Sequence, residues 1–173
     1  MTVTRAVAVG CGHYLPARVV ENAEFEASID TTDEWIRSRT GIERRHFAAE
    51  DEKTSDLAAK AAMAALNDAK LEGRDIDALI LATATPDQTF PYTATRVQHT
   101  IGMTNGFAFD VSAVCAGFIY ALSMANSLIM SGQAHRVMVI GAETFSRIMD
   151  WTDRGTCVLF GDGAGALILE GRP

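Results

Sequence analysis

Cysteine is scarce in this sequence, which has three in 173 residues, at positions 11, 115 and 157. They form no CxxC pair and cannot all pair with one another, so neither a disulfide framework nor a zinc site is indicated. Long apolar runs are also lacking: no stretch reaches the roughly eighteen residues of a membrane span, and the first apolar run is too short for a signal peptide. We therefore expect a soluble, cytoplasmic protein with reduced thiols and no membrane contact.

Positive charge is in short supply as well. Fifteen Lys and Arg residues stand against 22 Asp and Glu residues, which gives a formal net charge of −7. Nucleic acid and anionic membranes repel such a chain at long range, so nucleic acid is not expected as a partner. What the sequence does have is hydrophobic residues, at 48%. That content is enough for one sizeable core, and residues 1–173 are expected to form a single unit.

The apolar pattern predicts alternating strands and helices. Uninterrupted apolar runs of strand length, typical of strands covered on both faces, predict strands at residues 5–10, 77–84, 106–113 and 136–144. Helical spacing and capping signals predict helices at residues 30–42, 54–71, 93–102 and 115–132, the last of them buried because it is apolar nearly all round. Gly73 is expected to end the second helix, and residues 11–16 are expected to form a loop. These elements indicate an α/β fold.

The glycine-rich stretch GDGAGA, at residues 161–166, superficially resembles a dinucleotide-binding loop. It leads into the apolar run LILE rather than into a helix, so the context excludes a Rossmann site. We expect two short strands around a tight glycine turn, which makes residues 156–170 a hairpin.

Cys115 stands where a strand is expected to lead into a helix. The amino end of a helix favours a thiolate, and Ala116 and Gly117 leave room for a substrate carbonyl beside backbone N–H groups. The alternative is that Cys115 is a small buried hydrophobe, as most free cysteines are. Spacing alone leaves both interpretations open. Cys11 and Cys157 lack this context and are assigned to packing.

Four separated motifs, in order along the chain, resemble the amino-terminal half of β-ketoacyl-acyl-carrier-protein synthase III of the thiolase superfamily. They are DTTDEWIRSRTGIERRH, TPDQTFPYTA, DVSAVCAGFIYAL and DRGTCVLFGDGAGALIL. The resemblance implies a thiolase-like layered fold, with a mixed, mainly parallel five-stranded sheet covered by helices, as half of the usual pseudo-duplicated architecture. It also implies a homodimer, and that Cys115 takes an acetyl or other short acyl group from acyl-CoA for condensation with malonyl-acyl-carrier protein. Coenzyme A is then a substrate, and no cofactor is expected.

The family also uses a histidine and an asparagine for condensation, and the resemblance places both in the carboxy-terminal half, which this sequence does not contain. The four histidines of the chain match no catalytic position of the pattern. The chain alone is therefore expected not to complete the condensation. Two alternatives stay open: a thiolase-like synthase of secondary metabolism with another starter group, and a non-catalytic dimerising fragment.

The resemblance also assigns residues to the binding of coenzyme A and of the acyl group. Thr31, Trp35 and Arg39 are spaced by four, so a helix would place them on one face. By similarity to the family, Trp35 and Arg154 sandwich the adenine of coenzyme A, while Thr31 and Arg39 add polar contacts. Phe90, which is expected to cross a dimer interface, and Phe160 are assigned to the acyl pocket.

Positive charge is concentrated in one short segment of this acidic chain. Its four arginines could contact coenzyme A phosphates or an acidic carrier protein, although such clusters are mostly solvated surface. They are Arg37, Arg39, Arg44 and Arg45.

Overall fold

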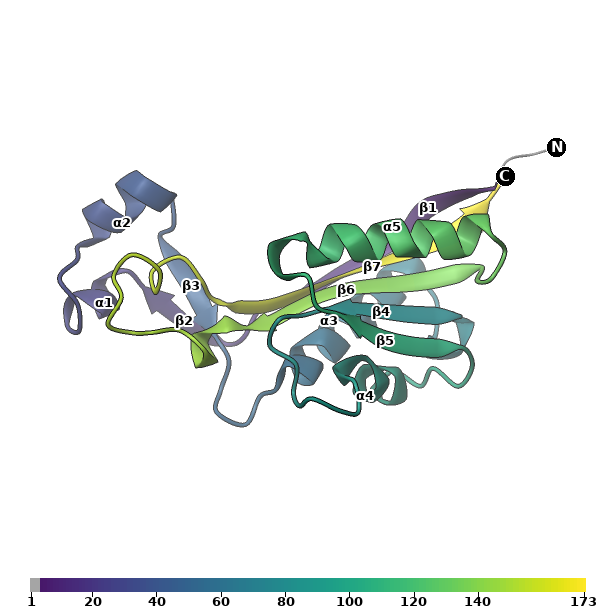
Figure 1. The fold of residues 1–173 in the computed structure, drawn as a ribbon, viewed down its shortest axis with the longest axis horizontal. Helices are drawn as coiled ribbons and strands as arrows, with labels where there is room; N and C mark the ends of the chain where they lie inside the picture. Colours follow the sequence, from purple (N-terminus) through teal and green to yellow (C-terminus); the bar gives the residue numbers. More distant parts are fainter. Residues whose placement is uncertain (1–3) are drawn as a thin grey trace.

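The computed structural model describes residues 4–173. Its main sheet has the strand order β1-β7-β6-β4-β5, made by β1 (Arg5–Tyr14), β4 (Ala78–Ala82), β5 (Phe107–Val111), β6 (Arg136–Thr144) and β7 (Asp162–Arg172). β4 pairs in parallel with both β5 and β6, whereas β7 is antiparallel to β6 and to β1. All strands except β7 thus share one direction, and the expected mixed, mainly parallel five-stranded sheet is confirmed (Figure 1).

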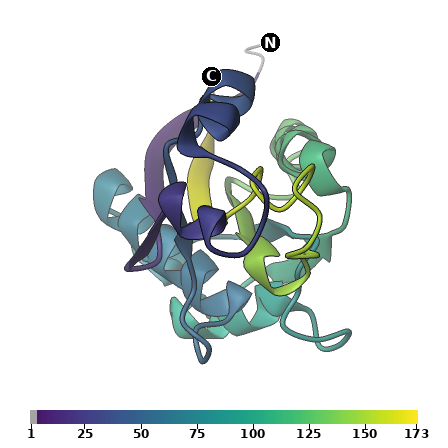
Figure 2. The ribbon, with the colours of Figure 1, turned by 90° about the vertical axis from the view of Figure 1, so that its left-hand side faces the viewer.

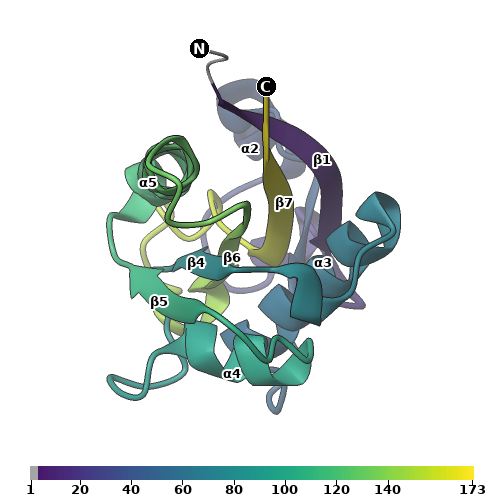
Figure 3. The ribbon, with the colours of Figure 1, turned by 90° about the vertical axis from the view of Figure 1, so that its right-hand side faces the viewer.

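Helices cover both faces of this sheet. α3 (Thr54–Ala69) and α4 (Thr93–Thr100) lie on one face, and α5 (Gly117–Met130) lies on the other, as the view in Figure 3 shows. Successive residues of β4 serve the two sides: Leu79 and Leu81 pack in the cluster with α3 and α4, and Ile80 packs in the cluster with α5. Because both faces are buried, the strand is apolar without alternation, as the sequence indicated.

A smaller lobe lies at one end of the sheet and faces the viewer in Figure 2. It contains β2 (Arg18–Glu21), α1 (Ala23–Glu26), α2 (Asp33–Thr40) and β3 (Arg44–Phe47). β2 and β3 form an antiparallel pair. The core of the lobe includes Cys157 and Val158 from the loop before β7. Of these elements the sequence predicted α2, which begins after the N-cap Thr32 and ends at Gly41 with φ 74°.

Glycine misled the prediction at two places in the main sheet. β1 does not end at Gly10 but continues to Tyr14. Its glycines allow α3 to pack closely, because a Cβ on Gly12 would be 2.3 Å from the Ala65 backbone nitrogen. The expected hairpin over residues 156–170 is wrong. The glycines lie within the single long strand β7 or just before it, between β1 and β6.

Two helix predictions also need correction. α3 ends at Lys70, which takes the left-handed conformation with φ 56°, and Gly73 instead begins a short 3-10 turn against Ile101. α5 is not buried on all sides: Ala121 and Ala125 face the sheet, whereas Ile119 and Tyr120 are exposed. Nothing within residues 4–173 covers that outer face. None of the helices in this range is long and apolar enough to cross a membrane.

Candidate active site

Cys115 lies between β5 and α5, in the 3-10 turn Val114–Ala116. The helix proper starts two residues later than the sequence indicated, at Gly117. The cysteine is exposed, so the interpretation of a buried hydrophobe is wrong. β4 and β5 are parallel and end at the same edge, the place where open α/β sheets bind ligands.

The backbone around Cys115 is tightly constrained. Val114 has φ 47°, a conformation that β-branched residues rarely adopt and that the surrounding structure must enforce. Gly117 then packs onto β4, because a Cβ at this position would lie 3.2 Å from the Ala82 Cβ. The strand end and the helix start therefore fix the turn from both sides.

The amino end of α5 lies next to the thiol, and the two backbone N–H groups that follow Cys115 are paired: Ala116 donates to the Ala113 carbonyl at 3.1 Å, and Gly117 donates to the Val114 carbonyl. Ala116 is the N-cap, and its side chain makes no capping hydrogen bond. The first N–H groups of a helix have no partner within the helix, and they carry a partial positive charge. This partial charge can stabilise a thiolate or the oxyanion that forms when a thiol attacks a thioester.

A partly buried polar network that the sequence did not reveal lies at the same edge of the sheet. The Glu143 carboxylate, near the end of β6, accepts hydrogen bonds from the Ala84 N–H at 2.8 Å and from the Thr85 hydroxyl at 2.5 Å. Thr85 Oγ1 in turn accepts from the Thr144 N–H at 2.9 Å. The network fixes the segment that follows β4. Its signal in the sequence was a carboxylate at the end of an otherwise apolar strand.

Three of the predicted coenzyme A residues lie together in the lobe. The guanidinium carbons of Arg39 and Arg154 are 4.4 Å and 4.8 Å from the centroid of the Trp35 ring. A base stacked between the Trp35 ring and the Arg154 guanidinium requires the two groups to be roughly 7 Å apart, which is two van der Waals contacts. The observed 4.8 Å is too short, so Arg154 itself lies where the base would stack. Arg154 also donates to the Asp30 carbonyl at 2.7 Å, and 44% of its side chain is exposed.

Thr31 does not share a helix face with Trp35 and Arg39. It precedes the N-cap Thr32, so the spacing of four has no helical meaning there. The residue is buried, and its hydroxyl is one of the buried side-chain atoms that have no hydrogen-bond partner in the described part of the chain.

The two phenylalanines assigned to the acyl pocket have different surroundings. Phe90 is 81% exposed, on the loop between β4 and α4. Phe160, just before β7, stacks on Phe145 with ring centroids 4.7 Å apart.

The four arginines of the basic segment do not form one patch. Arg37 pairs with Glu43 at 2.8 Å and with Asp33 at 3.6 Å. Arg45 is buried: its Nη2 donates to Asn22 Oδ1 at 2.9 Å and to the Val158 carbonyl at 3.0 Å. Arg39 and Arg44 remain exposed. The prediction of a shared surface cluster is wrong because the side chains of β3 alternate between the core of the lobe and solvent.

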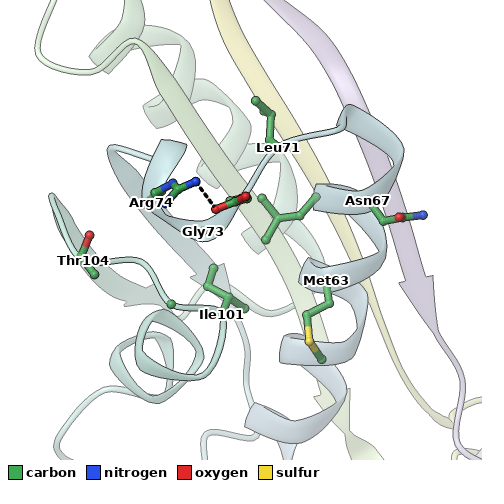
Figure 4. A pocket seen from close by; sticks show the side chains of 10 residues that line it. Met63, Asn67, Leu71, Gly73, Arg74, Ile101 and Thr104 are labelled. Carbon is green, nitrogen blue, oxygen red and sulfur yellow. Dashed lines mark ion pairs between the residues drawn. The ribbon is translucent and has the colours of Figure 1, made fainter.

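An open cavity of about 790 Å³ lies away from all the predicted site residues. Its lining comes from the end of α3 and from the segments before β4 and β5, and includes Met63 and Ile101; Figure 4 also shows the ion pair of Arg74, which is 2.7 Å from Glu72. It therefore lies at the amino ends of β4 and β5, opposite the edge with Cys115. No group of His, Cys, Asp or Glu that could hold a metal is found in residues 4–173.

Comparisons with known proteins match this arrangement. Residues 109–172 match the model of the family described as 3-oxoacyl-[acyl-carrier-protein (ACP)] synthase III. The β-ketoacyl-[acyl-carrier-protein] synthase III of Rhodobacter capsulatus is 75% identical over 98% of this chain and 52% of its own length. That of Ruegeria pomeroyi is 74% identical over 96% of this chain and 51% of its own length.

Solved structures agree with the curated relatives. The 3-oxoacyl-[acyl-carrier-protein] synthase III of Aquifex aeolicus superposes with a TM-score of 0.93 at 49% identity, covering 98% of this chain and 54% of its own. The priming β-ketosynthase of the R1128 polyketide pathway has a TM-score of 0.94 at 36% identity, covering 99% and 52%. The resemblance seen in the motifs and the thiolase-like fold are confirmed. Over nearly all of its own length the chain is similar to β-ketoacyl-acyl-carrier-protein synthases III, and it spans about half the length of the curated relatives it matches.

Proposed function

We propose that this chain is the amino-terminal half-domain, residues 1–173, of a β-ketoacyl-acyl-carrier-protein synthase III and that it carries the nucleophile, Cys115. The complete enzyme takes an acetyl or other short acyl group from acyl-CoA and condenses it with malonyl-acyl-carrier protein to start fatty-acid synthesis. The observation that carries the proposal is the exposed thiol of Cys115 beside the uncapped start of α5.

Acyl transfer follows from that geometry. The Cys115 thiolate attacks the thioester carbonyl, and the partial positive charge at the amino end of α5 stabilises the oxyanion. The new carbon–sulfur bond to Cys115 forms as the bond to coenzyme A breaks, and the coenzyme A thiolate leaves with a proton from solvent. The product is an acylated Cys115 and free coenzyme A.

The nucleotide of coenzyme A is assigned to the lobe. Trp35 offers a flat ring, and Arg39 and Arg154 offer guanidinium groups suited both to stacking and to phosphate. Arg154 must turn away from Trp35 for adenine to stack there, and its partly exposed side chain leaves room for that rotation. The unpartnered hydroxyl of Thr31 is a further polar group of this region.

Condensation requires residues that this chain does not supply. By the family resemblance, the histidine and the asparagine that promote decarboxylation of malonyl-acyl-carrier protein belong to the other half of the protein. We therefore propose that residues 1–173 contribute the acylation site and that condensation needs the complete enzyme.

The proposal includes a homodimer in the cytoplasm. β5 is an edge strand of the main sheet, and Phe107 on it is exposed, as is Phe90 on the loop between β4 and α4. An exposed edge strand with aromatic side chains is suited to pairing with a second copy. The free thiols of all three cysteines are compatible with a reducing compartment.

Labelling with radioactive acetyl-CoA, followed by peptide mapping, tests the proposal in the complete enzyme. We expect label on Cys115 and none on Cys11, which is also exposed and thus controls for mere accessibility. Cys157 is buried and serves as a second control. Label on Cys11 or Cys157, or none on an enzyme with both halves present, would contradict the proposal.

A second function is favoured by one comparison. The R1128 priming β-ketosynthase has almost the same fold over this chain, so a synthase of secondary metabolism with another starter group is the alternative. Competition between acetyl-CoA and longer acyl-CoA substrates separates the two. Preference for acetyl-CoA supports the fatty-acid enzyme, and preference for a longer starter supports the alternative.

A further inference from the structure

The proposed nucleotide site is assembled from two segments that lie far apart in the sequence. Trp35 and Arg39 belong to α2, whereas Arg154 belongs to the loop between β6 and β7. The contact between Arg154 and Asp30 is partly exposed to solvent. A surface contact of this kind contributes little to holding α2 and the loop together. Ile36 of α2 packs with Cys157 and Val158 of the loop in the core of the lobe, and apolar packing alone does not set the orientation of the polar groups above it.

A buried polar connection runs beneath that site. Arg45 Nη2 donates to the carbonyl of Val158, in the loop, and to Asn22 Oδ1. Asn22 Nδ2 donates to Asp33 Oδ1 at 2.8 Å, in the first turn of α2, and to the Ile42 carbonyl at 2.7 Å. Arg45 and Asn22 therefore link the loop that carries Arg154 to both ends of the helix that carries Trp35.

The position of Arg45 is unusual for a structural residue. The residue is 6% exposed and Asn22 is 1% exposed, and no carboxylate pairs with the guanidinium among the described residues. Within residues 4–173 its Nε and Nη1 have no hydrogen-bond partner, and the group lies 4.6 Å from the centroid of the Phe25 ring. Burial lowers the pKa of Arg45. An apolar side chain would avoid this desolvation, so stability alone does not explain the arginine.

We propose that Arg45 and Asn22 are positioning residues for the binding of the nucleotide of coenzyme A. They set the spacing between Trp35 and Arg154, so that a purine can enter when the Arg154 guanidinium turns aside. The inference rests on the proposed function, and it adds to it two buried residues that do not touch the ligand.

The two tryptophans of the sequence allow a direct test. In the complete enzyme, Trp151→Phe leaves Trp35 as the only tryptophan of this segment, and Trp35 fluorescence is then titrated with adenosine 3′,5′-bisphosphate and with coenzyme A. Tryptophans of the other half, if any, are replaced in the same background. We expect Arg45→Met to weaken binding of both ligands by roughly tenfold, the usual effect of losing hydrogen bonds to a charged group. Arg45→Lys, which keeps a cationic donor, should recover part of the affinity.

A second measurement separates positioning from a general loss of structure. Acetyl-pantetheine lacks the nucleotide, so its rate of Cys115 acylation should be unchanged in Arg45→Met. Arg136→Met is the matched control, because Arg136 pairs with Glu170 at 2.7 Å at the far end of β6; it should leave both measurements unchanged. If Arg45→Met does not fold, Asn22→Ala is used in its place, because it breaks the same connection.

The outcomes distinguish this inference from the proposed function. If the wild-type enzyme binds coenzyme A and Arg45→Met or Asn22→Ala binds it equally well, the inference is overturned but the proposed function is not. An equal loss of acylation with acetyl-CoA and with acetyl-pantetheine also overturns it. Wild-type enzyme that neither binds coenzyme A nor acylates Cys115 overturns the proposed function and the inference together.

Discussion

Asp162 is expected to contribute more to stability than any other charged residue of the main sheet. The residue is 5% exposed at the start of β7. Its carboxylate accepts hydrogen bonds from the Ala48 N–H at 2.7 Å, from the Ser146 N–H at 2.8 Å and from the Ser146 hydroxyl at 2.6 Å. One side chain thus joins β7 to the segment after β3 and to the turn after β6.

Replacing Asp162 by alanine leaves these three donors without an acceptor. Each buried donor left unsatisfied costs about 1–3 kcal/mol, and because the two Ser146 donors can share a water, the expected total is about 3–5 kcal/mol. With a urea dependence of about 2 kcal/mol per molar, the unfolding midpoint should fall by roughly 2 M. Asp162→Asn keeps one acceptor oxygen, and about half of that loss is expected.

Urea unfolding followed by far-ultraviolet circular dichroism measures the effect. The slope should stay the same in all three proteins, since the surface exposed on unfolding does not change. A loss below about 1 kcal/mol for Asp162→Ala would refute the reasoning, because it would mean that the three bonds add nothing beyond what water supplies.

Further predictions concern packing, pH and thiol access. Gly12→Ala places a Cβ 2.3 Å from the Ala65 backbone and should lower stability by about 3 kcal/mol in thermal melts, whereas Gly165→Ala, with no atom within 4 Å, should change it by less than about 1 kcal/mol. Glu52 is partly buried, which raises its pKa, but hydrogen bonds from Lys60 and Tyr14 outweigh this and hold the pKa below its usual 4.5. Its stabilising contribution is therefore present above pH 4.5, and a titration of stability should show that contribution lost at lower pH in the wild type but not in Glu52→Gln. A thiol reagent should label two cysteines in the native protein and Cys157 only after unfolding.

The central strands β4 and β6 of the main sheet could be predicted from the sequence because they are buried on both faces. Runs such as residues 77–84 are apolar throughout, and this property does not depend on what packs against them. The start of α5 was also recognisable, since a strand, small residues and an apolar helix follow one another around Cys115. Local composition was sufficient in both places.

The two strands of the lobe could not be predicted because they are short and contain three arginines. Arg44 and Arg45 look alike in the sequence, but alternation in β3 sends Arg45 into the core together with Phe47. The buried positions of β3 recur with period two, but a strand of four residues is too short for that period to be recognised in the sequence. The same period explains why residues 156–170 were wrongly predicted as a hairpin. The glycines at 161, 163 and 165 occupy every second position just before and along β7, and they do not mark a turn.

The register of the sheet accounts for where the lobe lies relative to Cys115. β4 ends at Ala82, which pairs with Gly141, while β6 continues to Thr144 opposite Asp162 of β7. The three extra residues carry β6 and β7 roughly 10 Å past the end of β4, into the lobe at the left of Figure 1. α5 starts at that same edge, so the turn with Cys115 and the loop with Arg154 both leave the sheet in the direction of the lobe. A thioester held by its nucleotide at Trp35 would therefore extend toward the edge of the sheet where the thiol is exposed. Shortening β6 and β7 by a matched pair of residues should consequently impair acylation by acetyl-CoA more than acylation by acetyl-pantetheine.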